Sequence, residues 1–155
     1  MIMVDAYQDI TIPFQLSSVE FFTEVQRHLK PGGVMVVNLN MTSAQDGSIN
    51  QYLCDTMSSV FAHTYTNTVV FCSDSDDLRQ TFDENRVLLQ NTSYAAMMET
   101  VARDLRDYTG GDHILTDDKA PVELLGMRVL DELIDGQLSY YKEQFSMEEI
   151  INMVT

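Results

Sequence analysis

The sequence contains few basic residues and few cysteines. Only nine Lys and Arg stand against 24 Asp and Glu, which gives a formal net charge of −15. A nucleic-acid partner is not expected, because phosphate binding requires clustered Lys and Arg. The two cysteines, Cys54 and Cys72, form neither a metal-binding pattern nor a disulfide framework, which is compatible with a reducing cytoplasm.

Long apolar runs are also missing. No apolar stretch reaches the roughly 18 residues of a membrane span, and we expect no cleaved leader. These features predict a cytoplasmic chain without membrane contact. With 155 residues and 45% hydrophobic content, the chain is long enough for one domain with a core. Its acidic excess indicates either a solvated surface that aids solubility or an acidic pocket for a cationic substrate.

Apolar segments and a helical pattern alternate at the start of the chain. Residues 1–4 and 34–39 are nearly uninterrupted apolar segments, which predicts parallel strands buried on both faces. Between them, a capping box formed by Ser17 and Glu20 predicts the start of a helix that should end at Lys30. Two strands joined in this way form a βαβ crossover.

The rest of the chain is predicted to add a hairpin and then to become helical. A capping box at Ser48 and Gln51 predicts the start of a helix, which is followed by strands at 63–66 and 68–72. Further helices are predicted at 77–90, from Tyr94 to Tyr108, from Pro121 onward, and at 146–153. The apolar face of the helix that begins near Pro121 consists of Val122, Leu125, Val129 and Leu133. We expect one partial domain over 1–155, with 1–73 forming the sheet part and 74–155 a mostly helical part. The acidic run at 73–77 lacks the Gly and the distal Glu of a calcium loop, so no metal is expected.

Polar residues follow both predicted parallel strands. Asp5 and Asp9 follow the first strand, and Asn38 and Asn40 lie at the end of the second. In doubly wound α/β proteins, ligands bind outside the carboxyl ends of parallel strands. Carboxylates there can hold a cationic amine, accept its proton, or hydrogen-bond a ribose or an adenine amino group. The alternative is that these residues only cap or form turns.

Three ordered motifs carry a resemblance to a known family. They are DAYQDITIPFQL, HLKPGGVMVVNLN and ILTDDKAPVELL. Together they resemble the spermidine synthase-like branch of class I S-adenosylmethionine-dependent transferases. The resemblance implies an α/β fold, namely the C-terminal half of a Rossmann-like methyltransferase fold, with strands 4 to 7 and their flanking helices. The order of strands in the complete fold is 3-2-1-4-5-7-6, so residues 1–5 resemble the fourth strand, whose absent neighbour is the first.

The resemblance also implies a reaction and a set of site residues. The family enzymes transfer an aminopropyl group from decarboxylated S-adenosylmethionine to a diamine such as putrescine. The implied roles are cofactor contact for Asp5 and Ala6, amine binding and proton acceptance for Asp9, and substrate contact for Tyr7, Gln8, Asp117 and Asp118. Asp5 and Asp9 are four positions apart, whereas established spermidine synthases space these acids by three. For Asp117 and Asp118, the alternative is that one of them caps the helix near Pro121.

Three classes of function are open from the sequence. In the first, the chain is part of an aminopropyltransferase-like enzyme and is inactive without an N-terminal cofactor-binding half. In the second, it is part of an S-adenosylmethionine-dependent methyltransferase. In the third, it is a truncated interaction module without enzyme activity. The Gly-rich turn that receives the cofactor is not found, because the paired glycines at 32–33 and 110–111 follow no opening strand. An uncovered sheet edge favours association, so we expect a homo-oligomer or pairing with the missing half.

Overall fold

The computed structural model describes residues 1–5, 12–39, 47–67 and 69–144. In these ranges the chain forms a five-stranded sheet of order β1-β2-β4-β3-β5. The strands are β1 (Ile2–Val4), β2 (Met35–Asn38), β3 (His63–Thr66), β4 (Val69–Ser73) and β5 (Arg106–Asp107). The β1–β2 pair is parallel and the other pairs are antiparallel. The fold is therefore mixed α/β.

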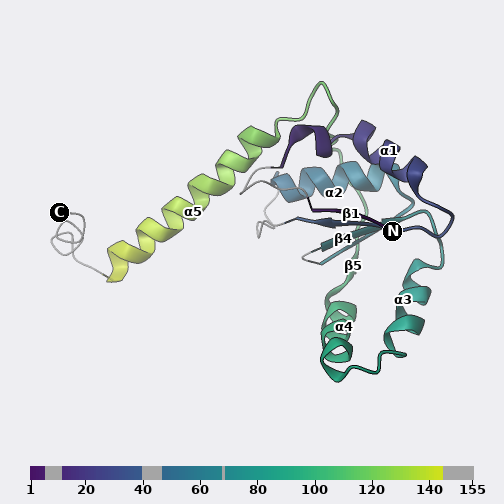
Figure 1. Cartoon of the computed structure of the whole chain (residues 1–155). Helices are drawn as coiled ribbons and strands as arrows, with labels where there is room; N and C mark the ends of the chain where they lie inside the picture. Colours follow the sequence, from purple (N-terminus) through teal and green to yellow (C-terminus); the bar gives the residue numbers. More distant parts are fainter. Residues whose placement is uncertain (6–11, 40–46, 68, 145–155) are drawn as a thin grey trace.

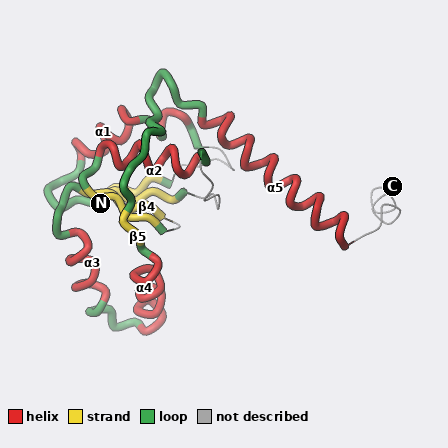
Figure 2. Tube along the Cα trace, turned by 180° about the vertical axis from the view of Figure 1, so that it is seen from behind, coloured by secondary structure: helices red, strands yellow, loops and turns green. Residues whose placement is uncertain are grey.

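The helices lie on both sides of this sheet. They are the short 3-10 helix η1 (Phe14–Leu16) and the α-helices α1 (Val19–His28), α2 (Ile49–Val60), α3 (Leu78–Arg86), α4 (Thr92–Asp104) and α5 (Val122–Gln144). Helices α1 and α2 cover one face, while α3 and α4 extend from the other side (Figure 1). The view from behind shows the same layers, with α5 projecting away from them (Figure 2).

The core fills the space between the sheet and helices α1 and α2. Met35 and Val37 alternate with less buried residues along β2 and are almost fully buried. They pair in register with Cys72 and Val70 of β4, which are buried on the same face. Phe22 of α1 is fully buried as well. The period of two in the strands thus places one apolar row of each strand against the helices.

Strand β1 does not have the predicted burial on both faces. Val4 is buried, but the side chain of Met3 is 63% exposed. Met3 pairs with Val36, which is half-buried, so these two side chains share the face opposite the core. Among the described strands, β1 pairs with β2 alone and lies at the edge of the sheet. The prediction fails because the described helices on that side pack near β3 and β4 and leave Met3 uncovered.

The predicted crossover and hairpin are confirmed. α1 connects the parallel strands β1 and β2, and β3 and β4 form an antiparallel pair. The predicted helix from Tyr94 to Tyr108 instead ends at Asp104. Its last part becomes β5, and the Tyr108 amide donates to the Thr64 carbonyl at 2.8 Å. Pairing with β3 therefore ends the helix before its apolar pattern does.

Other helix boundaries differ less from the predictions. Helix α1 ends at His28 rather than at Lys30, and α3 spans a shorter segment than 77–90. The predicted cap of α2 is confirmed, because the Ser48 side chain accepts a hydrogen bond from the Gln51 amide. The predicted amphipathic stretch at 146–153 lies outside the described residues.

The N-cap of α1 is Ser18, one residue after the predicted Ser17. Ser18 Oγ accepts a hydrogen bond from the Phe21 amide at 3.2 Å, whereas Ser17 Oγ donates to the Phe14 carbonyl at 2.7 Å. Glu20 does not complete the predicted capping box with Ser17, because its carboxylate accepts a hydrogen bond from the Asp117 amide at 3.0 Å. The sequence pattern finds the start of this helix but takes Ser17 instead of Ser18 as its N-cap.

This assignment predicts a cost for replacing Ser18. Ser18→Ala should lower the free energy of unfolding by about 1 kcal/mol, because it removes the side-chain acceptor of a helix N-terminus. Ser18→Gly should lower it by less, roughly 0.3 kcal/mol, since glycine, unlike alanine, is among the residues preferred at the N-cap position. Urea unfolding of both variants measures the difference. Equal values for the two would contradict the capping role.

Candidate active-site edge

Two predicted site residues meet at the carboxyl ends of β1 and β2. Asp5 directly follows β1, and Asn38 is the last residue of β2. Asn38 Nδ2 donates to Asp5 Oδ1 at 3.2 Å. Asp5 is exposed, and a carboxylate can accept further hydrogen bonds through its second oxygen. The parallel pair therefore places a carboxylate and an amide at one edge of the sheet.

Several predicted site residues fall in segments next to this edge. Ala6, Tyr7, Gln8, Asp9 and Asn40 lie outside the described residues. Their roles stay predictions.

Asp117 and Asp118 form the tip of a tight turn. The Lys119 amide donates to the Thr116 carbonyl at 2.8 Å, and both aspartates are exposed. Helix α5 begins at Val122, so the residue before it is Pro121 and neither aspartate stands at the N-cap position. The prediction that one of them caps this helix is wrong, because the turn ends before the helix begins.

The turn lies beside the N-terminus of α1. The Val19 amide donates to the Leu115 carbonyl at 2.8 Å, and the Asp117 amide donates to Glu20 Oε2. Because α1 connects two parallel strands, its N-terminus lies on the side of the sheet where β1 ends. The structure thus brings the turn of Asp117 and Asp118 to the same side as Asp5.

A buried carboxylate on α2 holds the segment that leads to this turn. Asp55 is 1% exposed and accepts hydrogen bonds from Tyr108 Oη at 2.6 Å, the Gly111 amide at 2.8 Å, and the amide and Nδ1 of His113 at 3.1 and 3.0 Å. Burial acts to raise the pKa of Asp55, but these hydrogen bonds outweigh it and hold the pKa below its usual value. The carboxylate therefore stays ionised at neutral pH and fixes residues 108–113 on α2.

The sequence patterns do not single out Asp55. The one signal in the sequence is that this acid stands between Cys54 and Met57 in α2, and both of these neighbours are buried. Gly111 allows the close approach, because a Cβ atom there would lie 2.8 Å from Asp55 Oδ2. The next residue of α2 is Thr56, whose Oγ1 accepts a hydrogen bond from the Leu115 amide at 2.9 Å. This series of contacts runs from α2 to the turn of Asp117 and Asp118.

The acidic run at 73–77 makes protein contacts. Asp74 accepts hydrogen bonds from the Ala62 amide at 3.0 Å and from Gln26 at 2.9 Å, and Asp76 lies 2.9 Å from His63 Nε2. In the described ranges, no group of three or more His, Cys, Asp or Glu is placed to hold a metal ion. No helix in these ranges has the length and apolar character needed to span a membrane.

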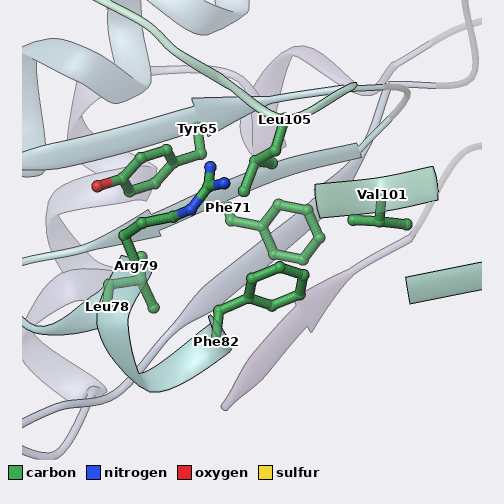
Figure 3. Close-up of a pocket in the computed structure, with 7 residues that line it drawn as sticks. All are labelled: Tyr65, Phe71, Leu78, Arg79, Phe82, Val101 and Leu105. Carbon is green, nitrogen blue, oxygen red and sulfur yellow. The ribbon is translucent and has the colours of Figure 1, made fainter. Parts of the chain in front are cut away.

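A small apolar pocket lies between the sheet and helices α3 and α4 (Figure 3). It is lined by Tyr65, Phe71, Leu78, Arg79, Phe82, Val101 and Leu105 and has a volume of about 40 Å³. Its one charged side chain is Arg79, which pairs with Asp83 at 3.2 Å and donates to the Ala102 carbonyl at 3.3 Å. Ligand sites are usually several times larger and contain convergent polar groups, so this pocket is a packing gap.

One comparison with known proteins identifies a relative. The chain is 44% identical over 167 residues to a protein of Bifidobacterium longum (strain NCC 2705) named "Probable polyamine aminopropyl transferase". This chain is a relative of that transferase. The match confirms the resemblance to the spermidine synthase-like branch that the three motifs indicate. It covers 92% of this chain but 37% of the relative, so the chain spans little more than one third of that protein's length. No protein-family model and no solved structure matches the chain.

Proposed function

We propose that this chain is the second half of an aminopropyl transferase domain and supplies the acids on the amine side of its active site. The contact between Asp5 and Asn38 carries the proposal, because it joins the DAYQD motif to the end of the next parallel strand. The named activity of the Bifidobacterium longum protein favours aminopropyl transfer over methyl transfer. The strand order β1-β2-β4-β3 also supports it, since it equals the order 4-5-7-6 implied by the resemblance.

The chemistry explains why acids would gather at this edge. The substrates are a diamine and decarboxylated S-adenosylmethionine, and both carry positive charge. The amine nitrogen attacks the carbon next to the sulfonium, the carbon–sulfur bond breaks with its electron pair on sulfur, and 5′-methylthioadenosine leaves. The amine must also give up a proton. Carboxylates lower the free energy of bringing two cations together, and one of them can accept the proton.

The residue roles follow from this reaction. We assign proton acceptance to Asp9 and contact with the sulfonium nucleoside to Asp5 and Ala6. Contact with the diamine is assigned to Tyr7, Gln8, Asp117 and Asp118. The position of the turn at 116–119 beside the N-terminus of α1 supports the last two assignments.

The chain alone should lack the surface that receives the nucleoside. The paired glycines of the sequence have other tasks in the described structure. Gly32 has a positive φ of 72° in the turn before β2, and Gly111 lies against the Asp55 carboxylate. Neither pair forms a phosphate- or nucleoside-binding turn after a strand. We therefore propose that the remaining part of the domain binds most of the sulfonium substrate.

A chimera tests the proposal. In it, this chain replaces its matching segment in the Bifidobacterium longum protein, and the purified chimera receives putrescine with decarboxylated or with ordinary S-adenosylmethionine. We expect 5′-methylthioadenosine from the decarboxylated donor and no turnover by the 155-residue chain alone. Production of S-adenosylhomocysteine from the ordinary donor would instead support a methyltransferase. A folded but inactive chimera, beside an active parent, would contradict both functions.

A further inference from the structure

Helix α5 carries an apolar stripe that the described part of the structure leaves uncovered. Val122 and Leu125 are buried and attach the start of the helix to the body. Beyond them the helix leaves the body and projects away from it (Figures 1 and 2). Among the described side chains of this helix, five large hydrophobic ones are at least half exposed: Leu124, Met127, Ile134 and Leu138, which form the stripe, and Tyr140, which lies outside it. Such an exposed stripe on a projecting helix indicates an interaction surface.

The spacing of the stripe is that of a coiled coil. Leu124, Met127, Asp131, Ile134 and Leu138 follow one another at intervals of three and four residues. At about 100° per residue, they fall within an arc of roughly 80° on the helix surface. The same geometry places the anchoring residues Val122 and Leu125 on the opposite side. The stripe therefore faces away from the contact between α5 and the body.

The charged side chains beside the stripe of one α5 helix are complementary to those of a second, antiparallel copy. Arg128 directly follows Met127, and Asp135 directly follows Ile134, so both lie on the same flank. When two such helices run antiparallel, the cation of one lies near the anion of the other, and the twofold axis repeats the pair. Among the described side chains, neither forms an ion pair within one copy.

A parallel arrangement fits less well. It would place Asp131 of one copy directly against Asp131 of the other, and two carboxylates in contact repel each other. An antiparallel arrangement staggers them by about 4.5 Å along the axis, opposite Ile134. The stripe and its flanking charges thus favour the antiparallel arrangement.

We propose that α5 pairs with α5 of a second copy of this chain as an antiparallel two-helix coiled coil. Met127 of one copy faces Leu138 of the other, and Asp131 faces Ile134. Each Arg128 lies beside Asp135 of the other copy. Because each body is attached at the N-terminal end of its α5 and the two helices run in opposite directions, the bodies lie at opposite ends of the pair. This inference does not depend on the proposed enzyme activity.

Charge reversal and charge exchange test the pairing. In sedimentation equilibrium, the chain should be a dimer, and Arg128→Asp or Asp135→Arg should each raise the dissociation constant by roughly tenfold. The double variant R128D/D135R should restore dimerisation, because it exchanges the charges of both symmetric pairs. Asp112→Arg changes an exposed acid outside α5 and should have no effect. Ile134→Asp should weaken the dimer by about 100-fold or more, since both copies lose an apolar contact.

Introduced thiols test the direction of the helices. The native Cys54 and Cys72 are buried, and burial raises the pKa of both to about 12, so they should not react under mild oxidation. The double variant M127C/L138C should form a covalent dimer. Met127→Cys alone should not, because the two introduced residues would lie about 16 Å apart along the axis, beyond the reach of a disulfide. A monomeric chain, cross-linking by the single variant, or failure of the charge exchange would overturn the proposal.

Discussion

Replacing Asp55 with alanine is expected to lower the free energy of unfolding by about 3 kcal/mol. The variant removes the acceptor of hydrogen bonds from Tyr108, Gly111 and His113 at a site that is only 1% exposed. Leaving buried donors without partners costs more than the loss of one surface interaction. Urea unfolding followed by circular dichroism measures the change. Tyr108→Phe, which removes only one of these bonds, should lower the value by about 1 kcal/mol.

Asp112→Ala is the matched control, because Asp112 is an exposed acid next to Gly111. Its effect should stay within about 0.5 kcal/mol, as for most surface substitutions. If Asp55→Ala and Asp112→Ala gave similar values, the hydrogen bonds of Asp55 would not hold residues 108–113 in place.

The same carboxylate should give the fold a dependence on pH. The pKa of Asp55 in the folded chain is below its usual value, which is about 3.9 in an unfolded chain. Its contribution to stability is therefore complete above about pH 4 and is lost as the pH falls through the folded pKa. Asp55→Asn keeps the shape but cannot ionise. Its free energy of unfolding should fall less steeply than that of the natural chain below about pH 4.

The sheet was predictable where its signals are local. Short apolar segments predict the strands β1 and β2 and the hairpin of β3 and β4 correctly, because neighbouring residues determine these features. The exposure of Met3 was not predictable, since it depends on which helices cover each face of the sheet. The end of α4 depends on a distant strand, because Tyr108 bonds to Thr64 rather than continuing the helix. Sequence periodicity cannot detect such competition.

In the candidate site too, some features were predictable from the sequence, while others depend on contacts between distant parts of the chain. The meeting of Asp5 and Asn38 follows from topology, because the carboxyl ends of neighbouring parallel strands share one edge. The position of Asp117 does not follow from topology, because it depends on hydrogen bonds of Leu115 to α1 and α2. Asp55 was missed because its partners lie more than 50 positions further along the chain. Short motifs do not contain this information.

The largest effect on turnover is expected from Asp9→Asn in the chimera. Asparagine keeps the size and polarity of the side chain but cannot accept the amine proton, so kcat should fall by about 100-fold or more. The affinity for decarboxylated S-adenosylmethionine should change little, because Asp9 is assigned to the amine. Steady-state kinetics and calorimetry with the donor measure the two quantities separately. Asp112→Asn, which removes a charge away from the proposed site, should leave both unchanged.

Asp5→Asn should lower the affinity for decarboxylated S-adenosylmethionine more than it lowers kcat. Its carboxylate accepts a hydrogen bond from Asn38 at the sheet edge and is assigned to the sulfonium nucleoside, so the loss should appear mainly in donor affinity. The comparison matters because Asp5 and Asp9 are spaced by four positions rather than by the three of established spermidine synthases. Suppose that Asp9→Asn reduced donor affinity as strongly as kcat. Asp9 would then bind the donor, and the proton of the amine would have to pass to another acceptor.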